Sequence, residues 1–589
     1  MPSIFIIFLA FAVAYYSTFV YCLIRNAYLA RKTGFPSIVV PWDQNHFIWM
    51  VTSVPLRPRL QKWLPRWMYS RLVLTIYGWE FHERLRPMKE YSGPSGNDKS
   101  FMLVTCGKPE FWTCDPEIAN EILRRPRDFQ QNELTELFMS RFGHNVLTTN
   151  GDRWARQRKI IATVINERIS KAVFNESVRQ TEGLLNEVFR SSTQSDVAGE
   201  SNKVFDMIKK ITIHVLSGAG MGASVQWDDD GNEKPKAGFK MTYIQAVKTV
   251  IHNVGGPIIL PQWFLSNYPG FLPGSKNLNL LGHAIKEFPT HTMDLLSQER
   301  QRSATCKDGE ARNNIMSQLL QASRNDPGAD EKGRALSDEE MMGNLFIFTA
   351  AGFDTTANTL SYATVLLARF PKWQDWLLEE VDSIMPLDMT NEQLEYTAVF
   401  PRAIRILAFM LETLRLFTPL IHLSKQTKTP QTIQTSRGNY SLPTNTTVYV
   451  NTVALGLDPT VWRNLNIGEG EVPSDNDENN FRPTRWINPP GVSQAIFQPP
   501  KGAYLPWSTG PRTCPGQKMA QVEFTAVMLT LLKRHRVEAS PLDGESEDDV
   551  NERLDAQMRK SVSVLTLEMD GIYDATEDNG LRLRWKKRR

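Results

Sequence analysis

The stretch with the clearest chemical potential runs from Trp507 to Gly516 and contains one cysteine, Cys514. Two glycines let its backbone approach a flat ligand closely, and two prolines stiffen it. A helix is expected directly afterwards, at Gln517 to Lys533, so its N-terminus and the nearby Arg512 guanidinium both favour a deprotonated sulfur. The segment therefore predicts a tight loop that presents one thiolate, the form that binds a metal.

A single thiolate narrows the kind of metal site. Zinc and iron–sulfur centres need several cysteine or histidine ligands at short spacing, and Cys514 has no such neighbour in the sequence. Haem brings four ligands of its own and needs only an axial one from the chain. The competing interpretation is a buried structural cysteine, which is the usual fate of a lone Cys.

A second candidate lies in the segment Thr349 to Thr356. Gly352 costs about 1 kcal/mol in a helix interior, and close approach of a flat cofactor or of dioxygen would explain its presence. Asp354 and Thr355 offer a carboxylate and a hydroxyl that can move protons. The alternative is a helix kink with local side-chain to backbone bonding.

Two further pairs have helical spacing. Trp154 and Arg158 are four residues apart, so they share a helix face and can hold a carboxylate through an indole N–H and a guanidinium. Ordinary packing is the alternative for this pair. Glu412 and Arg415 are three apart and can form an ion pair, which contributes little where it is exposed.

Together these motifs resemble those of the cytochrome P-450 family. That family has a haem loop Phe-x-x-Gly-x-Arg-x-Cys-x-Gly, and here Trp507 replaces the phenylalanine. Its Trp-x-x-x-Arg, Ala-Gly-x-Asp-Thr-Thr and Glu-x-x-Arg motifs occur in the same order along the chain. The resemblance implies that Cys514 is the axial ligand of a haem iron and that Trp507 keeps an aromatic ring under the sulfur.

The resemblance also implies roles for the other residues. Asp354 and Thr355 would deliver protons, and Gly352 would lie beside the haem. The haem propionates would be neutralised by Arg512, Trp154, Arg158 and His422. For His422, a core histidine with satisfied hydrogen bonds is the alternative.

A structural triad is implied as well. In the resembled family the Glu-x-x-Arg pair is buried and is joined by an arginine from a downstream segment. Residues Phe481 to Trp486 match that segment. Arg485 is therefore expected to join Glu412 and Arg415.

The implied activity is that of an O2-dependent monooxygenase that takes electrons from NADPH through NADPH–cytochrome P-450 reductase, with cytochrome b5 as a further donor. Lys518, Lys533 and Arg534 are candidates for docking the reductase, although they also fit an ordinary solvated face. The substrate is expected to be a lipophilic small molecule. Analogy with filamentous-fungal members favours a terpenoid or polyketide intermediate of secondary metabolism.

Several functions remain open beside this one. Two alternatives would have the same fold. One is a fatty-acid or xenobiotic hydroxylase, and the other is a haem-thiolate isomerase or dehydratase that needs no reductase. Asp354 and Thr355 count against the isomerase, since such relatives usually lack that pair. A different class is a membrane-anchored haem or lipid binder without turnover.

The length and composition of the chain limit the fold that can hold these residues. The chain has 589 residues, 41% of them hydrophobic, which fits one large domain with additions. The resemblance implies a mainly α fold with small β-sheets. A net charge of +3 with interspersed signs indicates no nucleic-acid binding, and five cysteines without paired spacing favour a reduced setting.

An N-terminal membrane anchor is expected. Residues Ile4 to Ile24 carry no charge, are long enough for one transmembrane helix, and are followed by basic residues. We therefore expect a short lumenal segment at 1–3, an anchor at 4–24, a linker and membrane-proximal segment at 25–60 and a haem-binding domain at 61–589. The catalytic domain would face the cytosol from the endoplasmic reticulum. A cleaved signal peptide is the alternative.

Periodicity predicts the remaining elements. A capping box of Ser337 with Glu340 should open a helix of about 32 residues that ends before Pro371. Strands are expected within 100–114, at 447–453 after a turn at 438–446, and as a pair between 562–568 and 581–585. Helices are expected at 115–123, 166–189, 204–216, 239–252 and 519–532, and surface loops at 304–334, 468–480 and 541–552.

Overall fold

The computed structural model describes residues 2–588 except 93–98, 191–197, 224, 230–234, 255–256, 273, 306–312, 325–334, 387, 391–392, 469, 564 and 570–580. Most of the polar loop expected at 304–334 lies outside the described residues. The α-helices are α1 (Pro2–Arg31), α2 (Phe47–Trp63), α3 (Arg66–Leu72), α4 (Trp79–Glu83), α5 (Arg86–Tyr91), α6 (Pro116–Arg124), α7 (Glu133–Met139), α8 (Gly151–Val164), α9 (Glu167–Arg190), α10 (Val204–Val215), α11 (Tyr243–His252), α12 (Gln262–Ser266), α13 (Ser275–Thr305), α14 (Ile315–Arg324), α15 (Asp338–Arg369), α16 (Pro371–Ile384), α17 (Tyr396–Val399), α18 (Ile404–Leu416), α19 (Thr452–Gly456), α20 (Pro459–Trp462), α21 (Gln517–Lys533) and α22 (Glu547–Arg559).

The strands form two sheets and two hairpins. They are β1 (Ser37–Val39), β2 (Ser100–Val104), β3 (Glu110–Thr113), β4 (Phe129–Gln130), β5 (Ala198–Ser201), β6 (His422–Thr427), β7 (Gln431–Thr435), β8 (Gly438–Leu442), β9 (Thr447–Asn451), β10 (His535–Ala539), β11 (Val562–Ser563), β12 (Leu567–Glu568) and β13 (Leu583–Lys587). The larger sheet has the order β1-β2-β3-β9-β6-β4, the smaller one is β10-β13-β5, and β7-β8 and β11-β12 are hairpins. A mainly helical fold with small sheets is thus confirmed.

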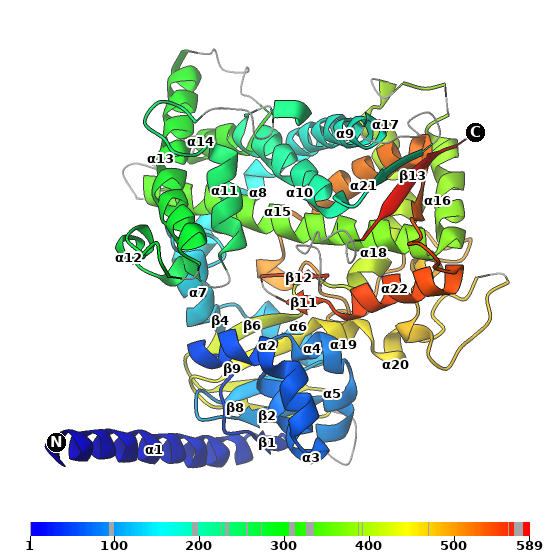
Figure 1. Cartoon of the computed structure of the whole chain (residues 1–589). Coiled ribbons are helices and arrows are strands. Elements are labelled where there is room, and N and C mark those ends of the chain that lie inside the picture. Colours follow the sequence, from blue (N-terminus) through cyan, green and yellow to red (C-terminus); the bar gives the residue numbers. More distant parts are fainter. Residues whose placement is uncertain are drawn as a thin grey trace.

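The helix α15 is the central support of the helical part. It crosses the middle of that part, while the larger sheet lies below it (Figure 1). The predicted capping box is present: the Glu340 backbone N–H donates to Ser337 Oγ, and the Ser337 N–H donates to Glu340 Oε2, both at 3.2 Å. The helix has the 32 residues expected, and its side chains are mostly buried.

The N-terminal helix differs from the prediction. Among the described residues, none of the helices combines the length and the apolar character needed to span a bilayer, so the transmembrane helix expected at residues 4–24 is not supported. The helix α1 projects from the body at its N-terminal end (Figure 1). Its C-terminal end packs on the body, because the Asn26 amide donates to the carbonyl oxygens of Thr105 at 2.9 Å and Gly107 at 2.6 Å.

Three other element predictions are corrected. The segments 562–568 and 581–585 do not pair with each other: β11 pairs with β12 inside the first, while β13 pairs with β10 and β5. The turn expected at 438–446 begins with strand β8, which pairs with β7. The loop expected at 541–552 contains the start of α22, because Ser546 forms a capping box with Asp549.

Candidate active site

The cysteine loop is closed by its own backbone. The Cys514 N–H donates to the carbonyl oxygen of Trp507 at 2.9 Å, and the Thr513 N–H donates to that of Gly510 at 3.1 Å. Gly510 has a φ of +71°, and a Cβ there would lie 2.8 Å from the carbonyl oxygen of Leu123 in α6. Glycine is therefore required where the loop seats against α6. The Trp507 ring packs at the edge of a cluster that includes Trp462 and Trp486.

The Cys514 side chain is exposed, and three groups stabilise its thiolate. Desolvation raises the pKa of the thiol above its ordinary value, and the backbone N–H groups of Gly516 and Gln517 and the positive Arg158 offset part of that rise. The predicted effect of the helix start is confirmed. The guanidinium that acts on the sulfur is that of Arg158, however, and not that of Arg512.

Arg512 instead stacks on Trp154, with its Cζ 4.5 Å from the ring centroid. Its Nη2 donates to the carbonyl oxygen of Thr149 at 2.7 Å and to Asn150 Oδ1 at 3.0 Å. Burial lowers the pKa of Arg512 to about 10, and its Nε is buried without a partner. Within the described part of the chain, Arg158 has no hydrogen bond or ion pair.

The helix α8, which carries Trp154 and Arg158, is tied to the start of α15. Arg153 Nε and Arg156 Nη2 contact Glu340 Oε1 at 2.8 and 2.6 Å. The same carboxylate that caps α15 therefore fixes the position of α8.

The middle of α15 has one open side. Ala351 is exposed and Thr355 is partly exposed, while most neighbouring side chains of α15 are buried. Gly352 is partly exposed as well, and a Cβ there would lie 3.1 Å from Leu216 Cδ2, at the start of the π-helix Leu216–Gly220. Leu216 therefore takes up space that the missing side chain of Gly352 leaves, and the place of Gly352 beside a cofactor or dioxygen stays a prediction.

The two residues of the predicted proton path point to different partners. Thr355 Oγ1 donates to the carbonyl oxygen of Ala351 at 2.7 Å, on the open side of α15. Asp354 is buried and accepts a 2.5 Å hydrogen bond from Thr566 Oγ1, in the connection between β11 and β12. Asn358 donates to the same hydroxyl at 2.8 Å, so the hairpin holds the Asp354 carboxylate.

His422 begins β6 and is paired with a buried carboxylate. Its Nδ1 contacts Glu80 Oε1, and its ring centroid lies 4.9 Å from that of Tyr449 and 5.8 Å from that of Trp112. These are the contacts of the core-histidine alternative. Contact between His422 and a propionate stays a prediction.

The triad of Glu412, Arg415 and Arg485 is assembled as expected. Arg415 Nε and Arg485 Nε contact the Glu412 carboxylate at 2.8 and 2.9 Å, and all three side chains are fully buried. Burial alone would raise the pKa of Glu412, but the two arginines lower it to about 2.

The sequence interpretation missed a fourth member, Asp477. Its carboxylate contacts Arg482 and Arg485, each at 2.9 Å, and it is buried. The segment 468–480 was expected to be a surface loop because it is acidic, and that expectation is wrong at Asp477. The nearby arginines at 482 and 485 were the available signal.

One candidate for reductase docking is excluded by burial. Lys533 is buried, and its Nζ donates to the carbonyl oxygen of Met389. Lys518 is exposed and pairs with Glu167 at 2.9 Å, and Arg534 is exposed.

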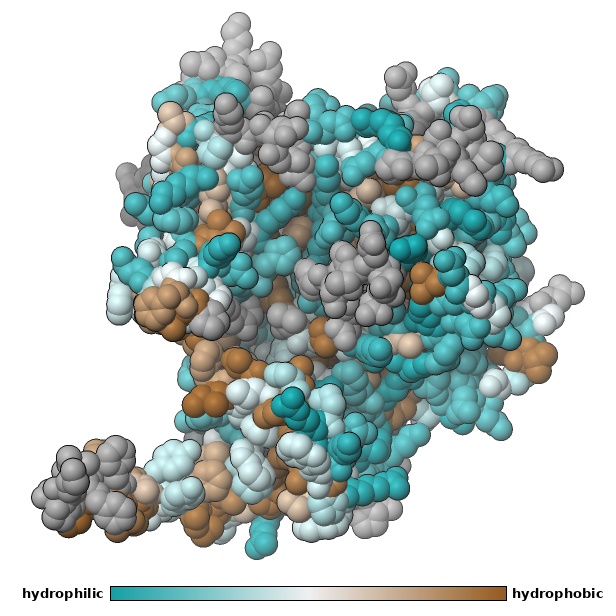
Figure 2. All heavy atoms as spheres, in the orientation of Figure 1, coloured by the Kyte–Doolittle hydropathy of each residue, from teal (hydrophilic) through white to brown (hydrophobic). Residues whose placement is uncertain are grey.

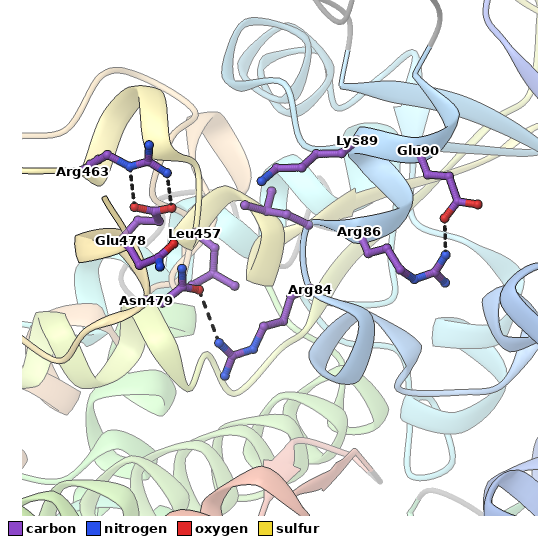
Figure 3. Close-up of a pocket in the computed structure, with 10 residues that line it drawn as sticks. Arg84, Arg86, Lys89, Glu90, Leu457, Arg463, Glu478 and Asn479 are labelled. Carbon is purple, nitrogen blue, oxygen red and sulfur yellow. Dashed lines mark hydrogen bonds and ion pairs between the residues drawn. The ribbon is translucent and has the colours of Figure 1, made fainter. Parts of the chain in front are cut away.

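A pocket of about 550 Å³ lies beside the triad, since Arg415 Nη1 donates to the carbonyl oxygen of its lining residue Glu478 at 2.6 Å. It is lined by Arg84, Lys89, Leu457, Asn479 and others, and Arg463 pairs with Glu478 at its rim (Figure 3). None of the predicted site residues lines it, so it is separate from the cysteine loop.

The donors around Cys514 fit a haem. The chain supplies one exposed thiol with N–H groups directed at it, as an axial thiolate requires. It also supplies two arginines that lack anionic partners among the described residues: Arg512, whose buried Nε is without a hydrogen bond, and Arg158. Two such guanidinium groups can pair with the two carboxylates of haem.

Comparison with known proteins agrees with this geometry. A family model described as "Cytochrome P450" matches residues 58–562. A "Phomenoic acid biosynthesis cluster cytochrome P450 monooxygenase" of Leptosphaeria maculans is 42% identical over 570 residues, 95% of each chain. "Cytochrome P450 monooxygenase 124" of Postia placenta is 27% identical and covers 77% of this chain and 79% of its own.

A solved structure shares the fold. The crystal structure of the cytochrome P450DA heme domain superposes with a TM-score of 0.63 at 17% identity, over 94% of this chain and 98% of that one.

Proposed function

The chain belongs to the cytochrome P450 family, and from this premise we propose that it oxidises a lipophilic intermediate of secondary metabolism. Membership makes it an oxidoreductase that incorporates oxygen from O2 and uses a haem with a cysteine thiolate ligand. The substrate class, the electron donor and the location of the chain are the proposed parts.

The observation that carries the substrate class is the similarity to the Leptosphaeria maculans protein. Its name places that protein in a gene cluster for phomenoic acid, and the similarity extends over 95% of both chains. The similarity therefore extends well beyond the haem loop. For this chain we propose a role in secondary metabolism, but not phomenoic acid itself. A terpenoid or polyketide would be a suitable substrate in such a role.

Different residues of the chain would bind the haem iron and transfer protons. Bound haem with a thiolate ligand supplies electron-transfer and dioxygen chemistry. Cys514 would hold the iron, with its charge stabilised by Arg158 and the start of α21. Thr355 presents its hydroxyl on the open side of α15 and would hand on a proton there. Asp354, held by Thr566 through one carboxylate oxygen, would resupply that proton.

Electrons would come from NADPH through NADPH–cytochrome P450 reductase, with cytochrome b5 as a second donor. The exposed Lys518 and Arg534 support docking of an acidic partner at this end of the molecule. Lys533 takes no part, because it is buried.

The endoplasmic reticulum membrane, with the catalytic domain on its cytosolic face, is the proposed location. Exposed apolar side chains support contact with lipid: Trp263 is 70% exposed and Phe271 is 87% exposed, near α12. Further exposed apolar residues lie on α1 and α2. Hydrophobic residues are frequent on the lower left of the molecule, around these two helices (Figure 2).

The test is turnover by microsomes that contain this chain and a P450 reductase, incubated with host extract and NADPH. We expect an ion that gains the mass of one oxygen atom, and a further two mass units under ¹⁸O2. Cys514→Ala microsomes are the control and should give neither this product nor the thiolate-type absorbance of the carbon-monoxide complex. A product that forms without NADPH would contradict the proposal.

A further inference from the structure

The pocket beside the triad carries an excess of positive charge. Its charged lining residues are Arg84, Arg86, Lys89, Arg463, Glu90 and Glu478. Glu90 is paired within the pocket, because Arg86 Nη1 contacts its carboxylate at 2.5 Å. Glu478 is paired as well, because Arg463 Nη2 contacts it at 2.6 Å. Both carboxylates therefore have a cation as partner, and two further cations remain.

These two cations, Arg84 and Lys89, have no anionic partner in the part of the chain that the structure describes. Arg84 Nη1 donates only to a neutral group, Asn479 Oδ1, at 3.4 Å. Burial lowers the pKa of Arg84, and the positive Arg415 and Arg559 act in the same direction. An anion that enters the pocket would therefore be attracted by both side chains.

The side chains of Arg84 and Lys89 are directed at the same side of the pocket. Both extend towards the segment that carries Glu478, whereas Arg86 points the opposite way (Figure 3). The Arg463 hydrogen bond lowers the pKa of Glu478, and the charge of Lys89 adds to this effect. The two cations without a carboxylate partner thus act on one region of the pocket.

Arg84 is also held in an unfavourable backbone conformation. It ends α4 with a φ of +50° and a ψ of −124°. Positive φ values favour glycine, and a residue with a side chain loses stability there. Strain of this kind gathers at binding and active sites, where the side chain has a role that glycine cannot fill. The conformation therefore points to a function for the Arg84 guanidinium.

A phosphate monoester matches the charge and the size of this pocket. It carries about two negative charges near neutral pH. Arginine binds phosphate oxygens through charge-assisted hydrogen bonds, and lysine acts on them as a point charge. The volume of about 550 Å³ is that of a small-molecule site and exceeds the need of a phosphate group alone. Leu85 and Leu457 supply apolar surface for an organic part.

We propose that the pocket binds an organic phosphate monoester, with its phosphate group on Arg84 and Lys89 and its organic part against Leu85 and Leu457. The pocket is separate from the cysteine loop, so the proposal depends neither on haem nor on the proposed substrate. Soluble nucleotides and the lipid phosphatidic acid both carry such a group, and they differ in the organic part.

The test is calorimetric titration of the purified full-length holoprotein with two soluble monoesters, AMP and dihexanoyl phosphatidic acid. We expect at least one to bind, more weakly as the salt concentration rises. The tighter of the two identifies the source of the phosphate group. Adenosine and dihexanoyl phosphatidylcholine, which lack a phosphate monoester, are the control ligands. Failure of both monoesters to bind at millimolar concentration would overturn the proposal.

Two variants place the binding in this pocket. Lys89→Gln should weaken the affinity about tenfold, and its fold should be unchanged because the Lys89 side chain has no partner among the described residues. Arg84→Gly removes the guanidinium together with the backbone strain, so it should weaken binding without lowering the melting temperature. Arg71→Gln is the matched control, since Arg71 is exposed on α3 and does not line the pocket. Unchanged affinity in Lys89→Gln or in Arg84→Gly would overturn the proposal.

Discussion

Asp354 and Thr355 are adjacent in sequence but are engaged with different neighbours. Thr355 donates to a backbone carbonyl of its own helix, so its hydroxyl stays on the open side of α15. Asp354 is held by Thr566 on the β11–β12 hairpin. Any delivery of protons through Asp354 is therefore coupled to the position of that hairpin.

Replacing Thr355 should disturb oxygen use more than folding. In Thr355→Ala the hydroxyl on the open side of α15 is lost, and we expect a several-fold larger share of consumed O2 to appear as hydrogen peroxide. Peroxide and O2 are measured together during NADPH oxidation. Thr356→Ala removes a buried hydroxyl one residue along and is the control. The same peroxide yield from both variants would remove Thr355 from the proton path.

Gly352 and Leu216 should be energetically coupled. Gly352→Ala gains about 1 kcal/mol of helix propensity, but its methyl group would crowd Leu216, at 3.1 Å from Cδ2. In a Leu216→Ala background the crowding is gone, so the substitution should be more favourable there by about 1 kcal/mol. Urea unfolding of the two single variants and the double variant measures this. Equal effects in both backgrounds would contradict a packing role for Gly352.

At the scale of elements, a cluster of buried charges joins α18 to the segment 477–486. Glu412 on α18 is bonded by Arg415 and Arg485, and Asp477 bonds Arg485 and Arg482. Each carboxylate therefore compensates more than one cation. Removing one of them leaves a buried cation without enough negative charge.

Asp477→Asn should therefore be strongly destabilising. Breaking a buried ion pair by removing one partner costs about 3–5 kcal/mol. Asp475→Asn, on the same segment but exposed, is the control and should change the free energy of unfolding by less than about 0.5 kcal/mol. Equal stability of the two variants in denaturant titrations would refute the role of Asp477.

The same cluster predicts loss of stability in acid. Desolvation opposes ionisation of Glu412 and Asp477, but their arginine partners lower the pKa of each to about 2. A carboxylate with a lowered folded-state pKa stabilises fully above its ordinary pKa, and that stabilisation is lost as the pH falls towards the folded value. We expect the melting temperature to drop between about pH 4.5 and pH 2, and Asp477→Asn to lose less over this range than wild type.

Local signals in the sequence predicted single elements well. Ser337 and Glu340 marked the start of α15, and Asp115 marked that of α6, because a cap depends on residues only a few positions apart. The four motifs located the cysteine loop and the triad for a similar reason, since each one is short.

Features that depend on distant partners were not predictable in the same way. The alternation of apolar and polar residues predicted a strand at 581–585, but it does not indicate which strands pair with it. Asp477 reads as a surface acid until Arg485 is placed next to it. The contact between His422 and Glu80 joins residues 342 positions apart, and nothing local to either residue indicates it.

At the scale of the whole molecule, α1 combines two different surfaces. Its first part carries exposed apolar side chains such as Phe11 and Tyr16, while Asn26 and Ala30 are buried against the body. The exposed apolar surface and the attachment to the fold thus use separate parts of one helix.

A shortened chain tests this division. Deleting residues 2–24 keeps Asn26 and its bonds to Thr105 and Gly107, so we expect the protein to fold and to bind haem. The truncated chain should shift from the membrane pellet to the supernatant on ultracentrifugation. An Asn26→Ala variant of full length is the counterpart, which should lose stability and remain in the pellet. Retention of the truncated chain in the pellet would contradict a membrane role for α1.

The order of the larger sheet has a consequence for biosynthesis. The strand β3 lies beside β9, with Glu110 opposite Thr447, so its partner leaves the ribosome about 340 residues later. At roughly 5–20 residues per second, the nascent β3 waits about 20–70 s with one edge unpaired. An unpaired strand edge can pair with other chains, so we expect the growing polypeptide to need chaperones during that interval. Slower translation after residue 113 would lengthen the wait and lower the yield of soluble protein.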